Sequence, residues 1–208
     1  SYRPKSRSTH MGQVLQNPYN AEKARLIVWE MADALSLELA EKHLTTDRLE
    51  LTVGYDIECL TRPEISTAYR GRIRLDRYGR RVPWPAHGRA LVERGTSTHT
   101  IMEALTALYD EIINPALLIR RLSISAHHLM RTDEIPPIEQ IDLFSAEETA
   151  QASLTEAEKK SHVKNHALQE AIVAIKKNYG KNAILRGANL LECATARLRN
   201  NQIGGHKA

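Results

Sequence analysis

Aromatic residues are scarce in this sequence, cysteines are few, and long apolar runs are missing. Aromatic residues make up 5% of the 208 residues, and Phe144 is the only phenylalanine, so we expect a core of aliphatic side chains. The two cysteines, Cys59 and Cys193, lie far apart and match neither a disulfide framework nor a zinc-binding pattern. Charged residues interrupt every apolar stretch short of a bilayer-spanning length, and no charged-then-apolar leader begins the chain. We therefore expect a cytoplasmic protein.

The residues that are present suffice for a folded domain. Hydrophobic residues make up 42% of the chain and charged residues 26%, with a formal net charge of +4 and a pI near 9.1. This length can bury a sizeable core as one domain with appendages. Because the chain begins with Ser-Tyr-Arg-Pro rather than with methionine, we expect it to be part of a longer protein.

The spacing of the apolar residues predicts two β-α-β units in the first 130 residues. The expected elements are an edge strand over 5–15, a helix over 19–43, a strand over 49–55, an arginine-rich interlude over 59–85 with a hairpin turn at Tyr78-Gly79, a strand over 88–94, a helix over 101–112 and a strand over 118–129. Thr100 and Glu103 fit a capping box at the start of the second helix. The charged side chains of the first helix are expected on its exposed face: Lys23, Arg25, Glu30, Asp33 and Glu41.

Two such units interleave into an α+β domain, a four-stranded antiparallel sheet with both helices on one face. The other face of the sheet is then left to solvent. On the predicted strands, arginine, serine and threonine alternate with the apolar residues. We expect this polar face to be the interaction surface of the domain.

The remaining chain divides into a linker and a helical tail. Residues 131–154 are acidic and show no periodicity, which is typical of a linker. Thr155 with Glu158 predicts the start of a tail helix that ends at Gly180, and a short helix is expected within 189–199. The tail helix carries an apolar stripe whose partner the sequence leaves open between this domain, a second copy and another protein. Its members are Val163, Ala167, Leu168, Ala171, Ile172, Ile175 and Tyr179.

The linker contains one sharp motif, Gln140-Ile141-Asp142-Leu143-Phe144. Adjacent Leu143 and Phe144 in an acidic, proline-flanked stretch suit a hydrophobic cleft on another protein, and such short segments fold on binding. The alternative is that the two side chains pack back on their own domain. The motif resembles the peptide that binds the bacterial sliding clamp.

Further segments carry a second resemblance. They are Lys5-Ser-x-Ser, Gly12-Gln-Val-Leu15, Val53-Gly-Tyr-Asp-Ile57, Tyr78-Gly-Arg, Ala86-His-Gly88, Arg120-Arg121, Lys176-Lys-Asn-Tyr-Gly-Lys-Asn-Ala-Ile-Leu-Arg186, Ala194-Thr-Ala-Arg197 and Ile203-Gly-Gly-His-Lys-Ala208. Together they resemble the C-terminal part of bacterial Y-family translesion DNA polymerases of the UmuC-like, DinB-related branch. The resemblance covers nearly the whole chain, and its most specific part is the tail.

This resemblance implies a little-finger DNA-binding domain over 1–130, a clamp-binding linker over 131–154 and a helical tail over 155–208. It implies primer-template DNA and the sliding clamp as partners in DNA repair. The chain lacks the carboxylate pattern of the polymerase palm, so we expect no catalytic residue, no DNA synthesis and no cofactor here, Mg²⁺ belonging to the parent enzyme. The expected DNA-binding residues are Lys5, Ser6, Arg7, Ser8, Arg89, Arg94, Thr96, Ser97, Thr98, Arg120 and Arg121. The arginine-rich interlude either extends this surface or is a solvated insertion.

Two alternatives come from other functional classes. A four-stranded sheet on two helices is also the shape of RRM domains, which stack RNA bases on exposed aromatic residues; here only Tyr55 qualifies. A metal-dependent nuclease would need Asp56 and Glu58 as ligands, but a lone pair falls short of a two-metal site. His127 and His128 are expected on opposite sides of a strand, so they cannot chelate one metal together.

Overall fold

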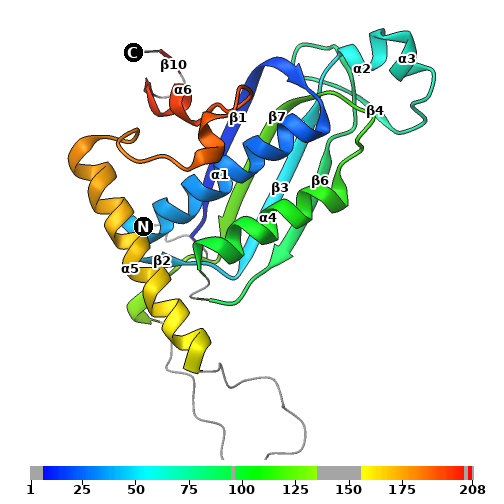
Figure 1. Ribbon diagram of the computed structural model, residues 1–208. Coiled ribbons are helices and arrows are strands. Elements are labelled where there is room, and N and C mark those ends of the chain that lie inside the picture. Colours follow the sequence, from blue (N-terminus) through cyan, green and yellow to red (C-terminus); the bar gives the residue numbers. More distant parts are fainter. Residues whose placement is uncertain (1–6, 95–96, 135–155, 204–205, 208) are drawn as a thin grey trace, which may run out of the picture.

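The computed structural model describes residues 7–94, 97–134, 156–203 and 206–207. Its centre is a four-stranded antiparallel sheet in the order β1-β7-β3-β6 (Figure 1). The strands are β1 (Thr9–Tyr19), β3 (Arg48–Tyr55), β6 (Ala86–Leu91) and β7 (Ile119–His127). Strands of the two β-α-β units therefore alternate across the sheet, and the predicted α+β class is confirmed. The first strand is an edge strand as expected, although it begins and ends four residues later.

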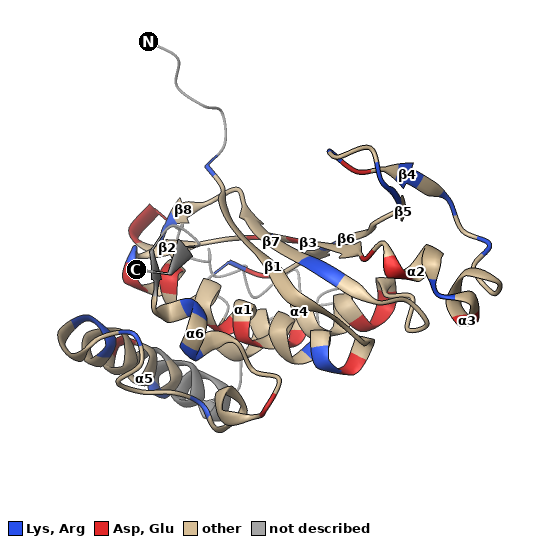
Figure 2. Cartoon of the chain, turned by 90° about the horizontal axis from the view of Figure 1, so that it is seen from above, with Lys and Arg blue, Asp and Glu red and all other residues tan. Residues whose placement is uncertain are grey.

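Helices α1 (Ala21–Glu41) and α4 (Thr98–Ile112) cover one face of the sheet (Figure 2). Every second residue of β3 is buried beneath them, including Leu49, Leu51 and Val53, as the alternation predicted. Helix α4 lies close to β6, because a Cβ on Gly88 would come within 2.8 Å of Leu108. In the described part of the chain, no helix is long and apolar enough to cross a membrane.

The beginnings of the two helices follow ordinary capping chemistry. The side chain of Asn20 accepts the backbone N–H of Lys23 at 2.9 Å and caps α1. The cap of α4 is Ser97, whose hydroxyl accepts the N–H of Thr100 at 3.3 Å. The predicted capping box of Thr100 and Glu103 is therefore wrong, and Glu103 instead pairs with His99.

The interlude between the two β-α-β units contains two short helices that were not predicted and the hairpin that was predicted. Helices α2 (Glu58–Thr61) and α3 (Pro63–Ser66) follow β3 and were not expected. Strands β4 (Ile73–Leu75) and β5 (Arg81–Pro83) form the predicted hairpin. Its turn contains Gly79, whose φ of +75° is a conformation that glycine adopts at little cost.

Outside the interlude, the structure contains three further short elements that were not expected. They are a small strand pair, β2 (Leu44–Thr45) with β8 (Met130–Arg131), and the 3-10 turn η1 (Thr132–Glu134).

The tail forms a third layer on the helical side of the domain (Figure 2). Helix α5 (Glu156–Tyr179) packs on α1, and η2 (Gly187–Leu190), α6 (Ala196–Asn200), β9 (Gln202–Ile203) and β10 (His206–Lys207) follow it. The predicted stripe on α5 is only partly correct, because Leu168 and Tyr179 are 58% and 79% exposed. Its members Ile172 and Ile175 are half-buried, and Gln169, outside the predicted stripe, donates to the carbonyl oxygen of Ser36 at 3.1 Å. The predicted cap at Thr155 lies outside the described residues.

Candidate nucleic-acid interface

The sheet surface opposite α1 and α4 is called the open face here. Burial alternates along the strands, and the cross-strand register aligns the exposed positions in rows. No described helix covers this surface, since α5 and α6 both pack on the helical side. The open face comprises His10, Gly12, Val14, Arg48, Glu50, Thr52, Gly54, His87, Arg89, Leu91, Arg121, Ser123, Ser125 and His127.

Hydrogen bonds between neighbouring strands hold several polar side chains of the open face in place. The ring of His10 lies between two hydroxyls of β7, 3.0 Å from that of Ser125 and 3.2 Å from that of Ser123. On the other half of the sheet, the hydroxyl of Thr52 lies 3.0 Å from Nδ1 of His87. These contacts order hydrogen-bonding groups across all four strands.

The charge on the open face is positive but includes one carboxylate. Glu50 lies on the central strand β3, where its side chain contacts Arg89 at 2.8 Å and His127 at 3.2 Å. The guanidinium of Arg89 is therefore partly neutralised. Arg48 and Arg121 form no ion pair with any other described residue, so their charge is available to a ligand.

The structure brings some of the predicted DNA-binding residues together. Arg89 and Arg121 lie on the open face, and Arg7 and Ser8 extend β1 as exposed residues. Arg120 lies beside a register shift in β7, where it donates to the carbonyl oxygen of Gln16 at 2.7 Å. Its role is therefore partly structural. Lys5, Ser6, Thr96 and the motif Gln140–Phe144 lie outside the described residues.

Other predicted residues lie elsewhere. Arg94 forms an ion pair with Asp47 at 2.5 Å and donates to the carbonyl oxygen of His128 at 2.8 Å, so it joins two loops rather than facing a ligand. Ser97 and Thr98 are at the start of α4 and line a cavity on the helical side of the domain. The structure thus separates these three from the open face.

Several open-face residues were missed by the sequence reasoning. His10, Arg48, Thr52, His87, Ser123 and Ser125 were not among the predicted binding residues. The sequence contained a signal that could have identified those on β3 and β7. Apolar and polar residues alternate along these strands, so each residue between two buried positions lies on the open face. The prediction selected cations and hydroxyls near the ends of the predicted strands, and it passed over those in the middle of β3 and β7.

The two carboxylates of the nuclease alternative serve separate local contacts. Asp56 is 7% exposed, and its Oδ1 accepts the backbone N–H of Glu58 at 2.9 Å. Glu58 forms an ion pair with Arg62 on the next turn. Across the described ranges, no group of three or more His, Cys, Asp or Glu side chains converges as metal ligands do.

The aromatic residue required by the RNA-binding alternative faces the core. Tyr55 is 7% exposed, and its hydroxyl accepts the backbone N–H of Asn114 at 3.0 Å. Burial raises the pKa of this tyrosine. The interpretation of Tyr55 as an exposed stacking residue is therefore wrong.

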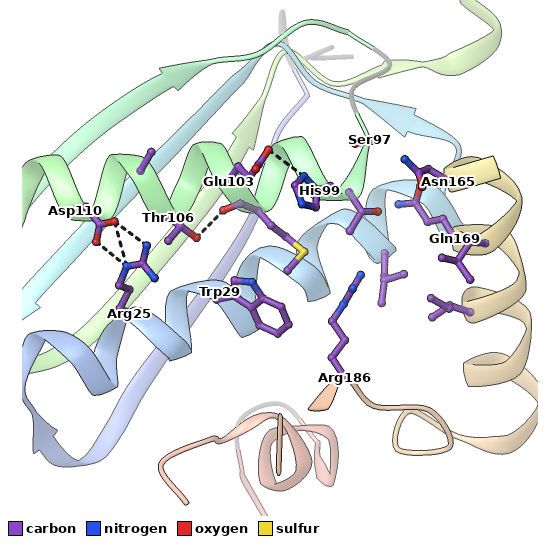
Figure 3. Close-up of a pocket in the computed structure, with 16 residues that line it drawn as sticks. Arg25, Trp29, Ser97, His99, Glu103, Thr106, Asp110, Asn165, Gln169 and Arg186 are labelled. Atoms are coloured by element: carbon purple, nitrogen blue, oxygen red, sulfur yellow. Dashed lines mark hydrogen bonds and ion pairs between the residues drawn. The ribbon is translucent and has the colours of Figure 1, made fainter. Parts of the chain in front are cut away.

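The helical side of the domain contains a cavity of about 540 Å³ between α1, α4 and α5 (Figure 3). The two arginines that line it each form an ion pair. Arg25 contacts Asp110 at 2.8 Å, and Arg186 contacts Asp33 at 2.8 Å while lying 5.7 Å from the ring of Trp29. This cavity therefore lies at the boundary between the domain and its tail.

No protein-family model matches this chain, and no curated protein matches it in sequence.

Proposed function

We propose that this chain binds duplex DNA through the open face, without sequence preference, as the C-terminal portion of a Y-family DNA polymerase that acts in translesion synthesis. The observation that carries the proposal is the one-sided arrangement of the molecule. Helices α1, α4 and α5 all lie on the same side of the sheet, and the opposite side carries arginines, histidines and hydroxyls. The proposed protein family rests on the sequence resemblance to Y-family polymerases.

The chemistry of the open face favours contacts to the sugar-phosphate backbone. Guanidinium and hydroxyl groups donate hydrogen bonds to phosphate oxygens, which position a protein on DNA without reading its sequence. Arg121 and Arg48 provide charge, while Ser123 and Ser125 provide hydroxyl donors beside them. Glu50 would repel a phosphate if it stood alone, but its ion pair with Arg89 offsets its charge.

In this proposal the fragment binds and the parent enzyme catalyses. Phosphoryl transfer with Mg²⁺ would take place in a palm domain outside this chain. The little finger would hold primer-template DNA behind that active site. The segment Gln140–Phe144 would dock on the sliding clamp and keep the enzyme at the replication site.

A salt series on primer-template DNA tests the proposal. Neutralising about five phosphates should give a slope of about −4 to −5 in a plot of log affinity against log salt concentration. The double variant Arg48→Glu/Arg121→Glu should weaken binding to all sequences alike and lower the slope by about 2.

The matched control is Lys23→Glu/Lys164→Glu, which makes the same change in net charge on helices α1 and α5. It should retain most of the affinity, because its residues lie on the helical side and tail. Equal losses from both double variants would mean that only overall charge matters. A loss that depends on base sequence would contradict backbone binding.

A further inference from the structure

The hairpin between the two β-α-β units concentrates the positive charge of the molecule. Residues 70–84, called the arginine hairpin here, contain six arginines and a single acidic residue, Asp76. Their formal net charge of +5 exceeds the +4 of the whole chain, so the other residues together carry −1. An electrostatic ligand site in this protein is therefore expected at this hairpin as well as on the sheet.

Most of this charge is not neutralised by carboxylates. Within the described residues of the hairpin, Arg80 contacts Asp76 at 2.7 Å and is the single arginine in an ion pair. Arg72 instead lies over the ring of Trp84, 4.4 Å from its centroid. Arg77 lies 4.6 Å from the centroid of Tyr78. Cations held over rings keep their charge available to an anion.

The same hairpin exposes flat aromatic rings. Tyr78 at the turn is 65% exposed, and Trp84 at the base of the hairpin is 46% exposed. Leu75 beside the turn is 64% exposed. Tyr55 and Tyr109 are buried in the core, whereas Tyr78 and Trp84 are exposed in the most basic segment of the chain.

The arginine hairpin packs on the domain through β5, and the rest of it projects beyond the sheet. Val82 is buried, and β5 packs against α2 and β3. The backbone N–H of Trp84 donates to the carbonyl oxygen of Arg72 at 2.8 Å and closes the strand pair. In Figure 2 the hairpin rises at one end of the sheet, on the side away from α1 and α4. A strand leaving the open face at this end would meet the hairpin.

We propose that the arginine hairpin binds single-stranded DNA, with bases stacked on Tyr78 and Trp84 and phosphates contacted by the surrounding arginines. Proteins that bind unpaired strands combine a basic surface with aromatic platforms, because each nucleotide presents a charged phosphate and a flat base. The proposal deepens the function proposed above, on which it rests: the open face holds the duplex and the hairpin holds the unpaired strand that continues from it.

The decisive measurement compares three labelled probes: a blunt duplex, the same duplex with a thymidine extension of about eight nucleotides, and a free thymidine oligonucleotide of similar length. The extension should raise affinity about fivefold or more, with stacking supplying the gain. Tyr78→Ala should remove most of the gain and leave affinity for the blunt duplex unchanged, while Tyr78→Phe retains it. Tyr179→Ala, which removes an exposed tyrosine of the tail, is the matched control.

Intrinsic fluorescence gives a second readout that does not depend on truncating the hairpin. Trp29 and Trp84 are the two tryptophans of the chain, so the variant Trp29→Phe leaves Trp84 as the reporter. The free oligonucleotide should quench its emission.

The proposal is overturned if the extension adds no affinity, if Tyr78→Ala keeps the gain, if Tyr179→Ala loses it equally, or if Trp84 emission does not respond. Competition by polyglutamate as effective as that by the oligonucleotide would identify an acidic protein as the ligand instead. A chain that binds the oligonucleotide but not the blunt duplex would contradict the proposed function while retaining this site.

Discussion

The Oε2 atom of Glu30 lies 2.8 Å from the backbone nitrogen of Thr195 and 3.1 Å from its hydroxyl oxygen. Glu30 belongs to α1 and Thr195 to the tail, at opposite ends of the chain. The same carboxylate accepts the N–H of Ala196 at 3.0 Å and the side-chain amide of Asn189 at 2.8 Å. Because Glu30 is only 2% exposed, these four donors replace the water that a buried carboxylate would otherwise require.

A half-buried polar side chain, that of Arg199, extends this contact. Arg199 donates to the side-chain oxygen of Gln13 at 3.0 Å and to the carbonyl oxygen of Glu30 at 3.4 Å. Burial lowers the pKa of its guanidinium. The tail is thus joined to β1 and α1 by specific polar contacts rather than by an apolar stripe.

Replacing Glu30 with alanine should release the tail and leave the sheet folded. The variant leaves several buried donors unsatisfied, and we expect it to cost about 3 kcal/mol of tail docking. Amide hydrogen exchange should show lost protection over 187–200 and retained protection in β3 and β7. Glu22→Gln, on an exposed turn of α1, is the control and should change neither. Unchanged protection in the tail of Glu30→Ala would contradict this account of docking.

Replacing Leu143 and Phe144 with alanine should abolish affinity for the sliding clamp and leave DNA binding intact. The adjacent apolar side chains provide the buried contact area of such a peptide, while DNA binding is assigned to the open face. Calorimetric titration with purified clamp measures the first property, and fluorescence anisotropy with primer-template DNA measures the second. Clamp binding by the double variant equal to that of the parent chain would refute the motif.

The buried hydroxyl of Tyr109 should make the stability of the domain sensitive to alkaline pH. Its hydroxyl donates to the carbonyl oxygen of Ala21 at 2.7 Å and joins α4 to α1. Desolvation by burial raises the pKa of Tyr109 well above the ordinary tyrosine value of about 10. The folded state therefore retains its proton where the unfolded state loses it, and the free energy of unfolding should fall as pH rises above about 10.

Urea unfolding at pH values on either side of about 10 measures this effect. The variant Tyr109→Phe should be less stable near neutral pH by about 1 kcal/mol, through the lost hydrogen bond, and should lose less stability on going to alkaline pH. Tyr179→Phe, changed at a residue that is 79% exposed, should behave as the parent chain at both values. An identical alkaline loss in all three proteins would assign the effect to other groups.

Local periodicity was sufficient to predict the two β-α-β units. Leu51 and Val53 alternate with polar residues, and Ile101 and Leu105 recur at helical spacing, so each element has one apolar face. The position of the α4 cap was not predictable in the same way. Ser97, Thr98 and Thr100 all belong to residue types that cap helices, and periodicity does not indicate that Ser97 is the one that does so.

Sequence reasoning also identified the polar face, but not all of its residues. The alternation of Arg121, Ser123 and Ser125 with buried neighbours placed that strand correctly. Arg94 was expected on the same surface because it is a cation near a strand end. Its partner Asp47 lies in a different loop. An ion pair between residues far apart in the sequence cannot be predicted from a local sequence pattern.

Taken alone, the amino-acid sequence determined the order of the elements in the two β-α-β units, the apolar side of each of these elements, and the class of the domain, because their patterns depend on residues close together in the chain. The tertiary structure decided where the charges act. It buried Glu30, expected on the exposed side of its helix, beneath a tail more than 150 residues away, and it left the arginine hairpin and the open face uncovered within the described chain. The physical reason is that the cost of a charge depends on its surroundings, and those are set by segments distant in sequence.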